Sequence, residues 1–464
     1  MHSGPDQSDI VQHPLEMARA SLGLSRVAYA RLIADAYNEL GSVLAAPDHR
    51  TTVPRPGSGA EAPGLTAQLA IAHVHRVPEA EVVRLGWPHW LHLVTDDAAL
   101  LYRRWTPQSA IDALGSTARL ADARPRTYLA VTGRALETLV KKALTALDHP
   151  LPVPSRDGCR VSPETLAHAE ARLEALELQE AGARVTPAVL YLAALAEHQL
   201  LTGLLTSGGY NPTSGARLLL LAARAAVLCG WLSGCLGEEA RAERHCLAAI
   251  RAAAAAGAPK RVACYLVELA SRHLLVGAPK DALSLVKAAR VAIRHPSPRF
   301  AAVLHTREAQ AFARLGEEKA ATRALIRATT ALSDDEPDRH RAPDPLCLNV
   351  DETWLAAASG TAWLHLGRPE KAMPCFTGLL VGSPAARPHL PPSPYLARCL
   401  LPVVDTQLAL GELDDAAATA HRAIALVGSL PPGLARQYRE RFAPQAADPA
   451  VRDLVEALAE QRGH

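Results

Sequence analysis

The sequence predicts an all-α protein, built from a small N-terminal helical bundle and a long array of helical hairpins. Apolar residues make up 49% of the 464 residues, but only 4% are aromatic, so Ala and Leu supply most of the apolar share. Ala and Leu favour helices, whereas strands favour aromatic and β-branched residues. A Gly–Ala frame recurs five times in the C-terminal half, and a helix–break–helix pattern lies near the N-terminus.

The chain divides into four segments. It is longer than one ordinary hydrophobic core, so two domains or one repeat array are expected. Composition and punctuation place the boundaries as follows: a polar, disordered N-terminus at 1–14, a helical module at 15–94, connecting helices with a proline-rich linker at 95–158, and the repeat domain at 159–464.

The repeat domain carries its own signature. In each unit a Gly ends one helix and an Ala lies five positions later. The pairs are Gly237 and Ala242, Gly277 and Ala282, Gly316 and Ala321, Gly367 and Ala372, and Gly411 and Ala416. Gly permits the left-handed backbone that ends a helix, and Ala permits two helices to cross closely. Such hairpins bury their faces by stacking into a solenoid.

The N-terminal module begins with two short helices. Residues 15–33, LEMARASLGLSRVAYARLI, place apolar residues near helical spacing on both sides of Gly23-Leu24-Ser25. Gly23 ends the first helix, and Ser25 is the predicted N-cap of the second. Two helices joined in this way form the positioning half of a helix-turn-helix, although any three-helix bundle shows the same pattern.

Several stretches together resemble a known family. They are R-x-x-x-G-L-S at Arg19, V-x-R-x-x-S-G-x-x-x-P at Val53, VPEAEVVRLGWPHWL (77–91), RTYLAVTGRALETLV (126–140) and TSGGYNPTSGARLLLLAARAAVLCGWL (206–232). This order resembles XRE-type helix-turn-helix regulators with a C-terminal tetratricopeptide-repeat domain from high-GC Gram-positive bacteria. The resemblance implies a degenerate N-terminal helix-turn-helix-like bundle followed by a tetratricopeptide-like α-solenoid.

The recognition helix departs from the family pattern. The family ends this helix with R-W-x-x-G; here Arg55 and Gly59 match, but Pro56 replaces the tryptophan and Pro54 precedes it. Each interior proline costs a helix about 3 kcal/mol. We therefore expect at most a short helix over 43–52 and weakened or lost DNA binding. If DNA binding is retained, the resemblance assigns it to Ser25, Arg26, His49, Arg50, Thr51, Thr52 and Arg55.

The repeat domain offers a second candidate site. In a tetratricopeptide-like hairpin the first helix of each pair lines a concave groove, and the helices before the repeat glycines are rich in Arg. Arg binds carboxylates bidentately, which suits a peptide partner. The predicted partner-binding groove residues are Arg217, Arg224, Glu268, Arg272, Arg307 and Arg314. The alternative is that these side chains are solvated or pair between helices.

No pattern predicts an enzyme, a metal site or a cofactor. The Gly-rich stretch 206–217 lacks the Lys-Ser/Thr that a phosphate-binding loop needs, so a helix connection is favoured. His73 and His75 lie two residues apart, so on a helix they point to different faces. His89 and His92 could share a face, but no carboxylate or Cys companion is evident nearby in the sequence. The eight cysteines form no C-x-x-C pair, which favours reduced cytoplasmic thiols.

Charge and hydropathy exclude some classes of partner. A net charge of +2 gives no strongly basic surface for nucleic acid, and the N-terminus has no signal-peptide pattern. The apolar run 218–236 contains Arg224 at its centre, which favours a packed helix over a membrane span.

Three functions remain open. The leading hypothesis is a cytoplasmic, regulator-like protein that binds a protein or peptide partner through its repeats. The first alternative is a working sequence-specific transcription factor controlled by a ligand in the repeat domain. The second alternative is a protein-interaction scaffold without a regulatory role. A homodimer is compatible with each of them.

Overall fold

The computed structural model confirms an all-α protein. It describes residues 14–43, 62–94, 100, 103–119, 129, 131–182, 185–333, 350–381, 394–427 and 430–460. Within these ranges the strands are the two-residue pair β1 (Cys159–Arg160) and β2 (Gly208–Gly209), which run parallel. The chain forms two compact units, one of residues 1–104 with 126–136 and one of residues 105–125 with 137–464.

The first unit is a small helical bundle. It contains α1 (Pro14–Ser21), α2 (Arg26–Val43), α3 (Leu65–Val74), α4 (Glu79–Leu85) and the 3₁₀ helix η2 (His89–Leu93). Its core includes Ala18, Tyr29, Ile33 and the fully buried Trp90. Helix α7 (Gly133–Asp148) spans the division between the two units.

The break between α1 and α2 follows the predicted chemistry, but the buried face of α2 differs. Gly23 has a left-handed φ of 69°, and the Ser25 hydroxyl accepts a hydrogen bond from the Ala28 amide at 3.2 Å. Helical spacing in the sequence predicts that Val27 and Leu32 lie on the apolar face, yet Val27 is 63% exposed and Leu32 39%. The sequence offers two overlapping apolar stripes here, and α2 buries the one that carries the larger Tyr29.

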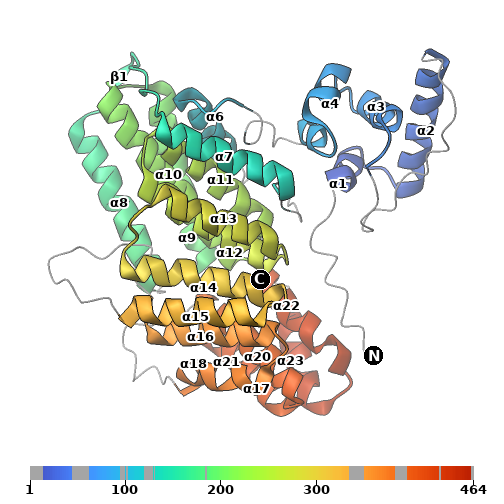
Figure 1. Cartoon of the computed structure of the whole chain (residues 1–464), viewed down its shortest axis with the longest axis vertical. Helices are drawn as coiled ribbons and strands as arrows, with labels where there is room; N and C mark the ends of the chain where they lie inside the picture. Colours follow the sequence, from blue (N-terminus) through green and yellow to red (C-terminus); the bar gives the residue numbers. More distant parts are fainter. Residues whose placement is uncertain are drawn as a thin grey trace. The chain divides into compact units, whose positions relative to one another are not determined.

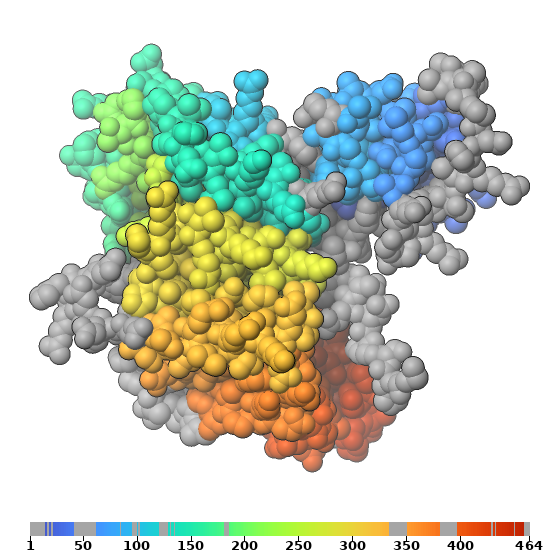
Figure 2. Space-filling model, in the orientation of Figure 1, coloured from blue at the N-terminus to red at the C-terminus, as the bar shows by residue number. Residues whose placement is uncertain are grey.

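The second unit is a stack of antiparallel helices (Figure 1). They are α6 (Pro107–Ala118), α8 (Pro163–Gly182), α9 (Pro187–Ser207), α10 (Pro212–Cys235), α11 (Glu239–Ala255), α12 (Pro259–Leu275), α13 (Pro279–Ala292), α14 (Pro298–Arg314), α15 (Glu318–Ser333) and α16 (Glu352–His365). The stack continues through α17 (Pro369–Ala372), η5 (Met373–Phe376), α18 (Thr377–Val381), α19 (Pro394–Cys399), α20 (Leu401–Leu410), α21 (Leu413–Val427), α22 (Pro432–Phe442), η6 (Ala443–Gln445) and α23 (Pro449–Glu460). On the face shown in Figure 2 the side chains of the middle hairpins form a continuous surface.

The Gly–Ala frame is confirmed at all five positions. The five glycines have φ between 68° and 82°, in the left-handed region. The five alanines are each 0% exposed. A helix therefore ends at each Gly, and the following helix crosses its predecessor at the Ala, as α14 and α15 do. The sequence spacing thus fixes where each hairpin turns and where it packs most closely.

Ala282→Leu and Ala321→Leu are expected to destabilise the second unit. Both side chains are fully buried at helix crossings, so three extra carbon atoms have no space there. Overpacking of this kind costs about 1–3 kcal/mol. The measurement is the midpoint of urea unfolding, with Ala418→Leu, on the exposed face of α21, as the control. Unchanged midpoints in both core variants would contradict the packing described.

The proline-rich segment 148–158 is packed against the rest of the second unit. Val153 is buried, and the backbones of Arg156 and Tyr210 exchange two hydrogen bonds of 2.9 Å. β1 then pairs with β2 directly after this segment. The prolines therefore mark an extended chain packed against the α9–α10 connection, where backbone pairing replaces helical hydrogen bonds. The sequence also predicts long loops at 333–352 and 382–396, and these lie mainly outside the described residues.

Candidate functional site

Arg217 and Arg224 on α10 pair with carboxylates of α8. Arg217 Nη2 lies 2.5 Å from Glu170 Oε2, and this pair is largely exposed. Arg224 donates from Nε and Nη2 to the two oxygens of Glu177 at 3.3 and 2.8 Å. Both arginines had been predicted to line a groove. The structure places them in interhelix ion pairs, the alternative that the sequence left open.

Arg272 and Glu268 belong to a buried charge network. Arg272 on α12 is 4% exposed, and its Nη atoms lie 3.1 Å from Glu239 Oε2 and 3.0 Å from Glu268 Oε1. Burial alone would lower the pKa of Arg272, but the two carboxylates outweigh it and raise that pKa. Arg398 of α19 completes the network, with Nη2 2.8 Å from Glu239 Oε1. Arg272 is therefore a structural cation rather than an exposed partner contact.

Arg307 lies on a half-buried polar surface between α14 and α16. Its Nη1 donates to Gln310 Oε1 at 2.9 Å, and its guanidinium lies 5.8 Å from the ring centre of Trp354. Gln310 in turn donates to the Ala358 carbonyl at 3.4 Å. We call Arg307, Arg314, Trp354 and His365 the α14–α16 surface; the buried Gln310 supports Arg307 from beneath. The surface joins a planar cation and an indole, a combination that commonly binds protein segments.

Arg314 ends α14 beside His365, the last residue of α16. Arg314 makes no hydrogen bond or ion pair with the described residues, and the Asp405 carboxylate acts on it only at longer range. Burial lowers the pKa of Arg314, and Asp405 opposes that shift. Burial, reinforced by the Arg314 charge, lowers the pKa of His365 to about 3. A neutral imidazole thus lies beside an arginine that directly contacts no described carboxylate.

Of the seven predicted DNA-binding residues, two lie among the described residues and five do not. Ser25 caps α2 and Arg26 begins it, and both side chains are exposed. His49, Arg50, Thr51, Thr52 and Arg55 lie outside the described residues, as does the predicted interruption at 53–60. Among the described residues, the predicted DNA contacts are therefore limited to Ser25 and Arg26.

The remaining sequence motifs have structural roles. Gly208 and Gly209 are buried in β2, and the Asn211 side chain caps α10 by accepting from the Ser214 amide at 2.8 Å. Within the described ranges no three His, Cys, Asp or Glu side chains group as metal ligands. The seven described cysteines form no disulfide with one another.

Two helices pass a length and hydropathy test for a membrane span. They are α9 and α10, whose apolar windows are 50% and 83% buried in the protein. Core helices of soluble proteins pass the same test, and the burial of α10 is typical of such a helix.

Sequence reasoning missed the partners that neutralise these arginines. Glu170 and Glu177 are seven residues apart on α8, the same spacing as Arg217 and Arg224 on α10, and this matched spacing is the signal that could have paired them. No sequence pattern could have paired Arg398 with Glu239, because the two residues lie 159 positions apart.

No protein-family model matches the chain, and no curated protein matches it.

Proposed function

We propose that this protein is a cytoplasmic, regulator-like protein that binds a protein or peptide partner on its α14–α16 surface. The observation that supports the proposal is the pairing of Arg307 with Trp354 on two neighbouring first helices of hairpins. Arg and Trp are enriched among the residues that contribute most to protein interfaces. Arg314 adds a cation that a partner carboxylate could neutralise.

The α14–α16 surface is a better candidate than the rest of the predicted groove. Arg224 and Arg272 already bind carboxylates of this chain, and a partner would have to break buried ion pairs to reach them. At α14–α16 the available groups are an arginine without a direct partner among the described residues and a half-buried indole. Binding there does not require the Arg224 and Arg272 ion pairs to break.

A working transcription factor remains the second candidate. The observation that favours it is the Ser25-capped α2, which meets α1 at Gly23 as in the positioning half of a helix-turn-helix. Selection of bound fragments from genomic DNA tests this candidate directly. Retention of a specific sequence at physiological salt would favour it over the partner-binding proposal, whereas binding that disappears as salt rises is only electrostatic.

Arg307→Glu and Trp354→Ala are expected to weaken partner binding by roughly 30-fold each, the loss typical of an interface residue worth about 2 kcal/mol. The partner is first captured from the native cytoplasm with the full chain and identified by mass spectrometry. Its affinity for each variant is then measured with purified proteins by titration calorimetry.

Arg217→Glu is the matched control, because it also reverses a first-helix arginine but lies on α10. Circular dichroism verifies that all variants remain helical. Equal partner affinity in the control and in both α14–α16 variants would reject this surface.

A further inference from the structure

The C-terminal hairpins touch the α10–α11 turn, far from their neighbours in the repeat array. Arg398 of α19 pairs with Glu239, the first residue of α11, and its Nη1 donates to the Gly234 carbonyl near the end of α10. In an ordinary repeat array each hairpin contacts only the hairpins before and after it. Here residues 159 and 164 positions apart are joined.

A close backbone approach adds a second contact between the same parts. A Cβ atom on Gly237 would lie 2.8 Å from the Cα of Gly433, at the start of α22. A side chain on Gly433 would in turn collide with the Leu236 carbonyl. Gly237 also needs its left-handed φ of 78°, but Gly433 has no positive φ. The lack of space for any side chain at this contact is therefore a sufficient reason for glycine at 433.

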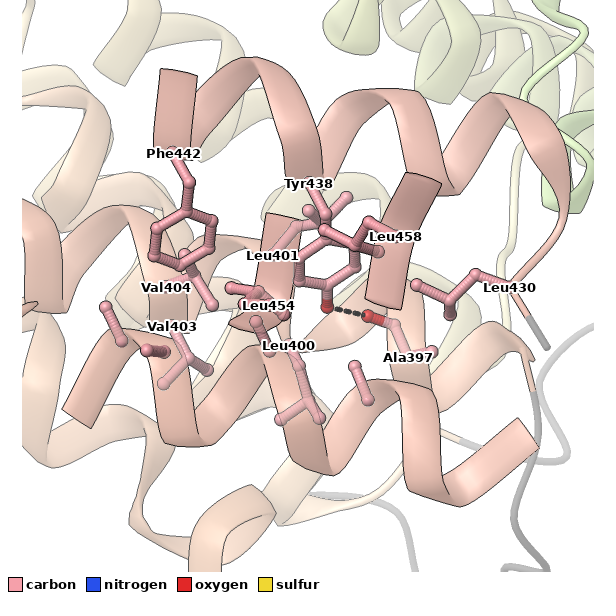
Figure 3. Packing of buried hydrophobic residues seen from close by; sticks show 14 of the residues in the cluster. Ala397, Leu400, Leu401, Val403, Val404, Leu430, Tyr438, Phe442, Leu454 and Leu458 are labelled. Atoms are coloured by element: carbon pink, nitrogen blue, oxygen red, sulfur yellow. Dashed lines mark hydrogen bonds between the residues drawn. The ribbon is translucent and has the colours of Figure 1, made fainter. Parts of the chain in front are cut away.

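The two contacts belong to one packed body. The Tyr438 hydroxyl of α22 donates to the Ala397 carbonyl of α19 at 2.6 Å, and both residues lie in the C-terminal hydrophobic cluster with Phe442 and Leu454 (Figure 3). Arg398 follows Ala397 directly. A movement of α22 away from the α10–α11 turn would therefore draw Arg398 away from Glu239.

Glu239 is suited to holding a cation. Its side chain is only 15% exposed. This partial burial alone would raise its pKa, but Arg398 and Arg272 outweigh it and hold that pKa below its usual value. Arg272 comes from the adjacent α12, whereas Arg398 comes from the far end of the array. If Arg398 leaves, Glu239 retains only one cation of this network, which is costly for a buried carboxylate.

We propose that α19 and α22 form a latch that closes the repeat array through Arg398 on Glu239 and Gly433 on Gly237. The latch concerns this protein alone and does not depend on the partner-binding function proposed above.

Hydrogen–deuterium exchange of the full chain tests the latch. Arg398→Ala removes the ion pair, and Gly433→Val disrupts the backbone contact without changing charge. Both are expected to speed exchange roughly tenfold or more in 234–240, α19 and α22, while α14 and α15 keep their wild-type rates. Arg217→Ala removes an Arg–Glu pair between neighbouring helices and is expected to leave all these segments unchanged.

Two results would overturn the latch. One is unchanged exchange in both variants. The other is faster exchange throughout the second unit, because closure would then be inseparable from folding.

Guanidinium ion tests what the Glu239 site accepts. Millimolar guanidinium chloride is expected to restore slow exchange around 234–240 in Arg398→Ala, since it can occupy the vacated place beside Glu239. It is expected to have no effect in Gly433→Val, where Arg398 is still present. Sodium chloride at equal concentration controls for screening. An identical response to the two salts would reject a cation-accepting site at Glu239, whatever the outcome of the partner-binding experiments.

Discussion

Replacement of Arg272 by Ala is expected to lower the free energy of unfolding by about 3–5 kcal/mol, the usual effect of removing one partner from a buried ion pair. The loss arises because Glu239 and Glu268 would remain poorly solvated, with only Arg398 of this network to compensate them. A domain has about 5–15 kcal/mol in total, so this single change brings the repeat domain close to unfolding.

Urea unfolding followed by circular dichroism measures this effect. Arg217→Ala is the matched control, because its ion pair with Glu170 is largely exposed, and such pairs contribute about 0–1 kcal/mol. Arg272→Ala together with Glu268→Gln is expected to recover part of the loss, since one stranded charge is removed. If Arg272→Ala is no more destabilising than the control, the charge network does not support the fold.

The hairpin array could be predicted because its signals are local. Gly316 ends α14, and Ala321 packs at the crossing with the next helix five residues later. Both requirements act on single residues: a left-handed backbone at one and a minimal side chain at the other. An Ala- and Leu-rich sequence supplies the rest of the helical tendency. Which hairpins meet beyond their neighbours depends on superhelical curvature, which no short pattern encodes.

The candidate site was harder to predict for the same reason. Helical spacing identified Arg224, Arg272 and Arg314 as polar residues of first helices. It did not reveal that Glu177 would neutralise the first and Glu239 the second, while the third would meet no carboxylate directly among the described residues. An arginine's role depends on the residue that faces it, and facing residues lie on other helices.

Buried histidines make the protein sensitive to acid. His198 and His273 are both 0% exposed, and burial lowers the pKa of each to about 4 from an ordinary value of 6.5. His198 bonds to the Thr117 hydroxyl at 3.0 Å and lies beside His245, which burial also keeps neutral. Asp281 lies 3.7 Å from the His273 ring.

The direction of the effect follows from proton binding. Between pH 6.5 and about 4 the unfolded chain binds protons that the native histidines do not. Stability is therefore fully present above pH 6.5 and falls as the pH drops towards 4. A shift of one pKa unit corresponds to about 1.4 kcal/mol. The lowered pKa values of His198 and His273 are therefore each expected to decrease the free energy of unfolding by about 3 kcal/mol as the pH falls from 6.5 to 4.

His273→Leu isolates one of these contributions. Because the His273 ring makes no hydrogen bond with a described residue, replacing it leaves none of those residues without a hydrogen-bond partner. The variant is expected to lose stability less steeply than the wild type between pH 6.5 and 4, by up to about 1.4 kcal/mol per pH unit. His421→Gln, at an exposed position of α21, should follow the wild-type curve. Urea unfolding at several pH values gives these slopes. If the stability of His273→Leu falls with pH at the same slope as that of the wild type, His273 has the same pKa in the folded and unfolded chain. Its burial would then not contribute to the loss of stability in acid.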